Sequence, residues 1–168
     1  MILKHWHLFL LVFICGAWVS PSPSREIVNS IAVVTFSLWI FAIGVYGQKR
    51  IVELGLNPMN IKLFKINVII VGGFFLTTLF FISNAEPVAS DTIELKDIPL
   101  ILGSLYLFFA IFQTIIFACK TIAKIELQKE VSFGDYSTNL FLMFFFFIGI
   151  WILQPKVNKL LTTNEQPK

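Results

Sequence analysis

The chain has 168 residues, of which 57% are hydrophobic and 14% are charged, and its mean hydropathy is +0.81. Soluble domains are about 45–50% apolar, with about a quarter of their residues charged. This composition therefore excludes a disordered chain, a disulfide scaffold and an ordinary cytosolic enzyme. The net charge is only +3 and the aromatic residues lie in apolar segments, so nucleic-acid binding is not expected. The composition favours one integral membrane domain over residues 1–168.

Five apolar segments follow one another along the chain: Leu8–Val19, Ile27–Tyr46, Ile66–Ile82, Pro99–Cys119 and Tyr136–Leu153. None contains an internal Asp, Glu, Lys or Arg. At 1.5 Å per residue, the second and fourth segments reach the roughly 30 Å of a bilayer core. Because lipid offers no partner for unpaired backbone groups, each segment is expected to be a helix. The sequence thus predicts an all-α, polytopic transmembrane bundle of about five helices.

The first segment has two interpretations. Lys4, the apolar stretch Leu8–Ile14 and the small pair Gly16–Ala17 are typical of a signal peptide, whose cleavage would leave four helices. Trp6 suits a membrane interface, and cleavage would place Trp18 at the start of the mature chain; both features favour a retained helix.

Local signals set the expected helix boundaries. The second helix is expected to continue to Leu54 and to stop at Gly55, because glycine readily adopts the left-handed conformation that follows a helix. Asn57 then supplies a cap and Pro58 a first helical position, so the third helix is expected to start near Pro58. The connection Gly55–Asn57 would force an antiparallel hairpin.

The remaining boundaries follow from acidic caps and breakers. The fourth helix is expected to run from about Ile98 to Val131, with Asp97 as its cap. Asp135 favours the positive dipole end of the fifth helix. Pro155 is expected to stop or kink that helix.

The distribution of Lys and Arg predicts the orientation, because cytoplasmic loops carry the excess. With the N-terminus in the cytoplasm, the inner side holds eight such residues: Lys4, Lys49, Arg50, Lys62, Lys65, Lys120, Lys124 and Lys129. The outer side holds five: Arg25, Lys96, Lys156, Lys159 and Lys168. The predicted location is the inner (cell) membrane, multi-pass, with a cytoplasmic N-terminus.

The C-terminal tail is the ambiguous part of this topology. A re-entrant fifth helix would move Lys156, Lys159 and Lys168 to the inner side and give a cleaner charge bias. The strongly apolar stretch Leu140–Leu153 instead favours a helix that spans. Spanning is the preferred interpretation, with the tail outside the cytoplasm.

Small and polar side chains form a stripe on the fourth helix: Gly103, Tyr106, Ala110, Gln113, Thr114 and Thr121, with Ala118 at its edge. At 100° per residue they fall within a sector of about 140°, and small residues let helices approach closely. The stripe is expected to pack against helices of the same chain, with Gly72, Gly73 and Thr77 as a facing surface. The alternatives are an interface with a membrane-protein partner or a second copy, and a polar substrate path.

No constellation typical of catalysis is recognised, so no catalytic, metal-binding or cofactor-binding residue is expected and the chain is not predicted to be an enzyme. His5 and His7 point about 200° apart on a helix, which does not suit a metal site. Cys15 and Cys119 are expected near opposite membrane faces and act as small apolar side chains. Basic residues at the inner helix ends are candidates for anionic lipid headgroups, with topology alone as the alternative.

Two stretches in the C-terminal third, Glu126–Tyr136 and Phe146–Lys159, resemble a family of uncharacterised small bacterial polytopic membrane proteins. That family ends in a pattern like P-I-G-V-W-F-I-Q-P-R-I-N-K and has an acidic-aromatic pair before its last helix. The matching residues here are Asp135, Tyr136, Gly149, Trp151, Gln154, Pro155 and Asn158. Phe147 stands where the family has proline, and Lys156 where it has arginine. The resemblance implies a membrane bundle and brings no activity with it.

These observations predict an integral membrane protein without an evident catalytic site, acting as an accessory or partner-binding component in the lipid bilayer. The alternative is a small transporter or channel for an uncharged or lipid-like solute, acting as an oligomer.

Overall fold

The computed structural model describes residues 23–81 and 97–162. Over these residues the chain forms five helices and no strand: α3 (Pro23–Glu53), α4 (Lys62–Phe81), α5 (Ile98–Leu127), α6 (Phe133–Phe144) and α7 (Phe146–Thr162). The expected all-α class is confirmed. Within this part of the chain, Ile31–Glu53 and Ile98–Leu127 are long and apolar enough to cross a membrane. The expectations for the first apolar segment, with its histidines and Cys15, lie outside the described residues.

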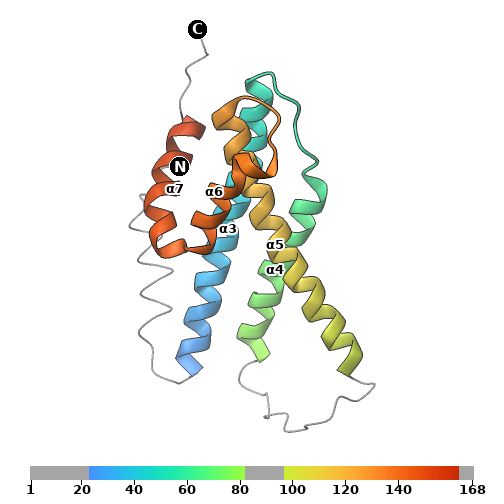
Figure 1. Ribbon diagram of the computed structural model, residues 1–168. Coiled ribbons are helices and arrows are strands. Elements are labelled where there is room, and N and C mark those ends of the chain that lie inside the picture. Colours follow the sequence, from blue (N-terminus) through green and yellow to red (C-terminus); the bar gives the residue numbers. More distant parts are fainter. Residues whose placement is uncertain (1–22, 82–96, 163–168) are drawn as a thin grey trace.

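The long helices α3, α4 and α5 run antiparallel in sequence order and pack against one another (Figure 1). The lower ends of α4 and α5 diverge in Figure 1, whereas α6 and α7 lie beside the upper halves of α3 and α5. The helix cap of α5 falls where it was expected, since Asp97 occupies the N-cap position, although its side chain makes no capping hydrogen bond. The helix ends at Leu127, four residues before the expected boundary, and Gln128 follows with φ of 50°.

The turn after α3 confirms the expected helix end at Gly55. Gly55 has φ of +71°, and its amide donates to the Val52 carbonyl at 3.0 Å. The amide of Leu56 donates to the Ile51 carbonyl, also at 3.0 Å. These two bonds form a Schellman motif, which satisfies carbonyls that the end of the helix would otherwise leave unpaired.

The expected start of the next helix is wrong by four residues. α4 begins at Lys62 rather than near Pro58, because the chain between the helices finds other hydrogen-bond partners. The amide of Met59 donates to the Gln48 side-chain oxygen at 2.7 Å, and the Lys62 amide donates to the Asn60 side-chain oxygen at 3.0 Å. The antiparallel arrangement of α3 and α4 is nevertheless as expected (Figure 1).

The core lies where α3, α4 and α5 meet around the fully buried Phe64. Its ring stacks on that of Phe117 with centroids 4.4 Å apart. Gly44 leaves room for this ring, and Gly47 leaves room for the methyl group of Thr121, since a Cβ at either glycine would overlap its neighbour. The close approach of α3 to its neighbours therefore depends on these two glycines.

The expected fifth helix is not one helix. It breaks at Phe145, and α6 and α7 fold back on each other as an antiparallel hairpin. A Cβ on Gly149 would overlap the Leu142 carbonyl, so the two helices are in close contact near the turn. Farther from the turn, Lys156 donates to the Asn139 side-chain oxygen at 3.1 Å.

This hairpin replaces the single helix that was expected over this stretch. Lys156 also forms an ion pair of 2.6 Å with Glu126, which lies one residue before the end of α5. The end of α7 therefore lies at the same end of the bundle as the end of α5. Pro155 does not stop this helix, since α7 continues through it to Thr162.

Candidate functional site

Polar side chains inside the bundle link helices that are distant in sequence. The first link joins α4 to α5. Asn67, with 0% of its surface exposed, donates to the Gln113 side-chain oxygen at 3.1 Å and accepts from the Tyr106 hydroxyl at 2.8 Å. A buried amide group has a high desolvation cost unless its hydrogen bonds are made. These bonds fix the register of the two helices.

The second link holds α3, α5 and the loop before α4 together. Gln48 donates to the Thr121 hydroxyl at 3.2 Å, while its oxygen accepts from the Met59 amide. The Thr121 hydroxyl in turn donates to the Phe117 carbonyl at 2.9 Å. Gln48 and Thr121 are both buried, so this end of the helix bundle is fastened by polar contacts as well as by apolar packing.

A buried cation lies one turn beyond this link. Only 2% of the Lys124 side chain is exposed, and its ammonium group forms an ion pair of 2.6 Å with Glu130, which is 74% exposed. The lysine stem lies in the core while the charge pairs at the surface. Lys124 therefore holds the loop between α5 and α6 and is not a free surface charge.

The third link attaches the hairpin to α3. The Trp39 indole nitrogen donates to the side-chain oxygen of the buried Gln154 at 2.5 Å. Gln154 donates in turn to the Asn158 side-chain oxygen at 3.3 Å. Together with the pairing of Lys156 with Glu126, these bonds attach α7 to α3 and α5.

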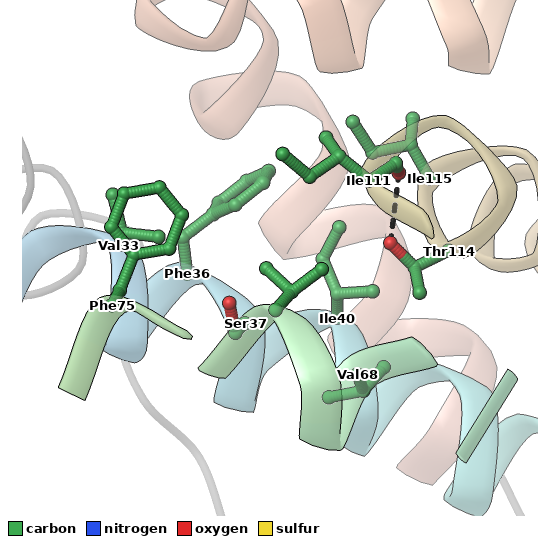
Figure 2. Close-up of a pocket in the computed structure, with 10 residues that line it drawn as sticks. Val33, Phe36, Ser37, Ile40, Val68, Phe75, Ile111, Thr114 and Ile115 are labelled. Atoms are coloured by element: carbon green, nitrogen blue, oxygen red, sulfur yellow. Dashed lines mark hydrogen bonds between the residues drawn. The ribbon is translucent and has the colours of Figure 1, made fainter. Parts of the chain in front are cut away.

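An apolar cavity of about 220 Å³ lies between α3, α4 and α5 (Figure 2). Ser37 and Thr114 are the only polar side chains among its ten lining residues, and the Thr114 hydroxyl donates to the Ile111 carbonyl at 2.8 Å. Apolar cavities of comparable size (about 150 Å³) stay dry and take up small apolar molecules. The cavity can therefore hold a hydrocarbon group and offers little to a polar solute.

The predicted stripe on α5 is divided between two environments. Ala110, Thr114 and Ala118 are buried against other helices. Gly103 and Tyr106 are exposed, although the Tyr106 hydroxyl reaches Asn67. Gln113 is half-buried and completes the same link.

The expectation that Gly72 and Gly73 pack closely against this stripe is wrong. A Cβ on Gly72 or Gly73 would meet nothing within 4 Å, so neither glycine makes a close contact with α5. The Thr77 hydroxyl donates to the Phe74 carbonyl of its own helix.

The residues of the C-terminal motif on which the expected resemblance rests differ in burial and in their contacts. Asp135 accepts from the Ser132 amide and hydroxyl, each at 2.8 Å, and pairs with Lys129 at 3.1 Å. Hydrogen bonds from Ser132, first from its amide and then from its hydroxyl, lower the pKa of Asp135 to about 2, with a further contribution from Lys129. Tyr136 is buried, and the Lys120 ammonium group lies over its ring, 5.3 Å from the ring centroid.

The other residues of this motif lie in α7. Gly149, Gln154 and Asn158 make the contacts described above. Trp151 and Pro155 are exposed. Contacts within the hairpin or with its neighbours thus include Asp135, Tyr136, Gly149, Gln154 and Asn158.

Several of the linking residues were not recognised from the sequence: Trp39, Gln48, Asn67 and Asn139. A signal was present for Asn67, which is the one amide side chain within the apolar stretch Ile66–Ile82, since polar residues inside such segments commonly bond to another helix. The sequence does not indicate that its hydrogen-bond partners are Gln113 and Tyr106.

No family model, curated protein or solved structure matches this chain. In the described ranges 23–81 and 97–162, no group of three His, Cys, Asp or Glu side chains is placed to hold a metal ion.

Proposed function

We propose that the chain is an integral membrane protein in which α3, α4 and α5 cross the bilayer and the α6–α7 hairpin re-enters it. The observation that carries this proposal is the distribution of polarity. Buried positions include Asn67, Thr121, Asn139 and Gln154, whereas large apolar side chains are exposed, among them Leu38, Ile69, Leu100, Leu105 and Phe108. In water this arrangement would be costly, because soluble proteins rarely leave extensive apolar surface uncovered. In lipid it is favourable.

The end of the bundle that holds the α3–α4 loop and the end of α5 is the proposed cytoplasmic end. It contains Lys49, Arg50, Lys62, Lys65, Lys120, Lys124 and Lys129. The pairing of Lys156 with Glu126 adds Lys156 to the same end, which strengthens the charge bias expected of a cytoplasmic side.

We further propose a non-catalytic, partner-binding role that uses the first half of α5. Every residue from Ile98 to Tyr106 is exposed in the described part of the chain. This half of α5 diverges from α4 in Figure 1. Gly103 lies on it, and a Cβ at this glycine would meet nothing within 4 Å, so a second helix can approach closely there.

Topology is tested by single cysteines in a background without Cys15 and Cys119. A membrane-impermeant thiol reagent is applied to intact cells after any outer membrane has been opened. Ile98→Cys should react, whereas Asn57→Cys and Lys159→Cys should react only after lysis. Reaction of Lys159→Cys in intact cells would overturn the re-entrant hairpin.

The partner role is tested by the native mass of the detergent-extracted protein. A defined hetero-complex is expected, and Gly103→Leu should dissociate it. Gly134→Leu, at another open helix glycine, should leave it intact. The same mass for the native protein and Gly103→Leu would contradict a partner at this surface.

The cavity of Figure 2 favours a second candidate, an oligomeric carrier of a lipid-like solute. The same measurement separates the two functions, since a carrier of this kind is expected to extract as a homo-oligomer.

A further inference from the structure

An open apolar groove runs along the outer side of the α3–α4 pair. Its wall on α3 consists of Val34, Ser37, Leu38 and Phe41, and its wall on α4 of Val68, Ile69, Gly72, Gly73 and Leu76. Its volume is about 340 Å³. The groove is open along its α4 wall, because Gly72 and Gly73 carry no side chain and no atom lies within 4 Å of a Cβ position at either glycine.

Basic side chains continue the two walls of this groove toward the proposed cytoplasmic end. On α4, Lys62 and Lys65 precede Ile69, Gly72 and Leu76 at spacings of three and four residues, which places all five on one helix face. On α3, Lys49 follows Phe41 two turns later.

These cations are available to a ligand. Lys49, Lys62 and Lys65 are exposed, and their ammonium groups form no ion pair with another residue of the described chain. Neighbouring cations differ in this respect, since Lys124 pairs with Glu130 and Arg50 with Glu53.

The dimensions match one leaflet of a bilayer. Lys65 and Leu76 are eleven residues apart, or about 16 Å along the helix axis. Half of the hydrocarbon core is about 15 Å. A cationic end and an apolar groove of this length together complement one phospholipid molecule.

We propose that this groove binds a single anionic phospholipid of the cytoplasmic leaflet, with its headgroup at Lys49, Lys62 and Lys65 and one acyl chain over Gly72 and Gly73. The proposal rests on the proposed membrane location. The acyl chain fills the gap that the two glycines leave between α3 and α4. The lysines contribute electrostatic attraction to the phosphate.

The test is native mass spectrometry of the full chain, delipidated in a neutral detergent and titrated with phosphatidylglycerol. Phosphatidylcholine with the same acyl chains is the comparison without net charge. One phosphatidylglycerol per chain is expected, bound more tightly than phosphatidylcholine. Lys65→Gln should weaken phosphatidylglycerol binding about fivefold, the equivalent of one lysine near an anionic surface. Lys159→Gln, which removes the same charge from α7, should leave the affinity within about twofold.

The groove itself is tested by Gly73→Leu, which places a side chain where the acyl chain is proposed to lie. The affinity of this variant for both lipids should fall about tenfold or more. Gly134→Leu, at an equally open helix glycine outside the groove, should bind as the native protein does. Equal effects of Lys65→Gln and Lys159→Gln, or native binding by Gly73→Leu, would overturn the lipid site. Carbonate extraction of membranes from cells that express the protein separates the proposed membrane location from the proposed lipid site. Release from the membrane would overturn the membrane location together with the site, whereas retention without selective binding overturns the lipid site alone.

Discussion

Trp39 and Gln154 are 115 residues apart in sequence, yet the indole of one donates a hydrogen bond to the side chain of the other at 2.5 Å. Both residues are buried. The bond joins the middle of α3 to the second helix of the hairpin, whose other polar contacts lie toward its end. The presence of this hydrogen bond therefore reports whether α7 packs against α3.

Replacing Gln154 with leucine should lower the free energy of unfolding by about 1–3 kcal/mol, because a buried indole N–H would lose its acceptor. The measurement is thermal unfolding in detergent. A double-mutant cycle with Trp39→Phe provides the control, since the two substitutions should be less than additive if they remove one shared bond. Additive effects would show that the hydrogen bond does not form.

Gly149→Ala should strongly reduce the yield of folded protein. The added methyl group would overlap the Leu142 carbonyl, and backbone cannot move aside as a flexible side chain can, so a loss of about 1–3 kcal/mol or more is expected. Gly72→Ala is the matched control, because it lies in an open part of a helix. Equal yields and thermal stabilities of the two variants would contradict the close contact of α6 with α7.

Gly55→Val should destabilise the α3–α4 turn by about 1–2 kcal/mol, because a β-branched residue resists the positive φ of +71° at this position. Gly55→Asn should be milder, since asparagine tolerates the left-handed region. Both variants are compared with the native protein by folded yield and thermal unfolding. Native stability of Gly55→Val would argue against the Schellman turn.

Asp135 should make stability depend on acid pH. Its pKa is lowered from 3.8 to about 2 by the Ser132 amide and hydroxyl and by Lys129. The folded state therefore favours the carboxylate, so the stabilisation is present above about pH 4 and is lost as the pH falls toward 2. Asp135→Asn should flatten the thermal stability of the protein between pH 4 and pH 2, and an unchanged profile would contradict the cap.

Features that depend on neighbouring residues were accessible to sequence reasoning. The helix end at Gly55, the cap position of Asp97 and the acidic first turn at Asp135 all arise from interactions within a few residues, and each was predicted. The same holds for the all-α class, which follows from long apolar segments without charges. For the candidate site, the burial of Ala110 and Ala118 on one face of α5 follows from helical spacing alone.

The features that sequence reasoning missed depend on distant contacts. α4 starts at Lys62 rather than near Pro58 because the Met59 amide donates to the side chain of Gln48, eleven residues earlier. The break at Phe145 has no glycine or proline at that position to announce it, and the hairpin is held by contacts from Trp39 and Glu126 on other helices. By itself the chain determined where helices can form and which of their faces are apolar. Only the tertiary structure decided which polar groups meet and that the last two helices fold back on each other, because those outcomes depend on residues in other helices.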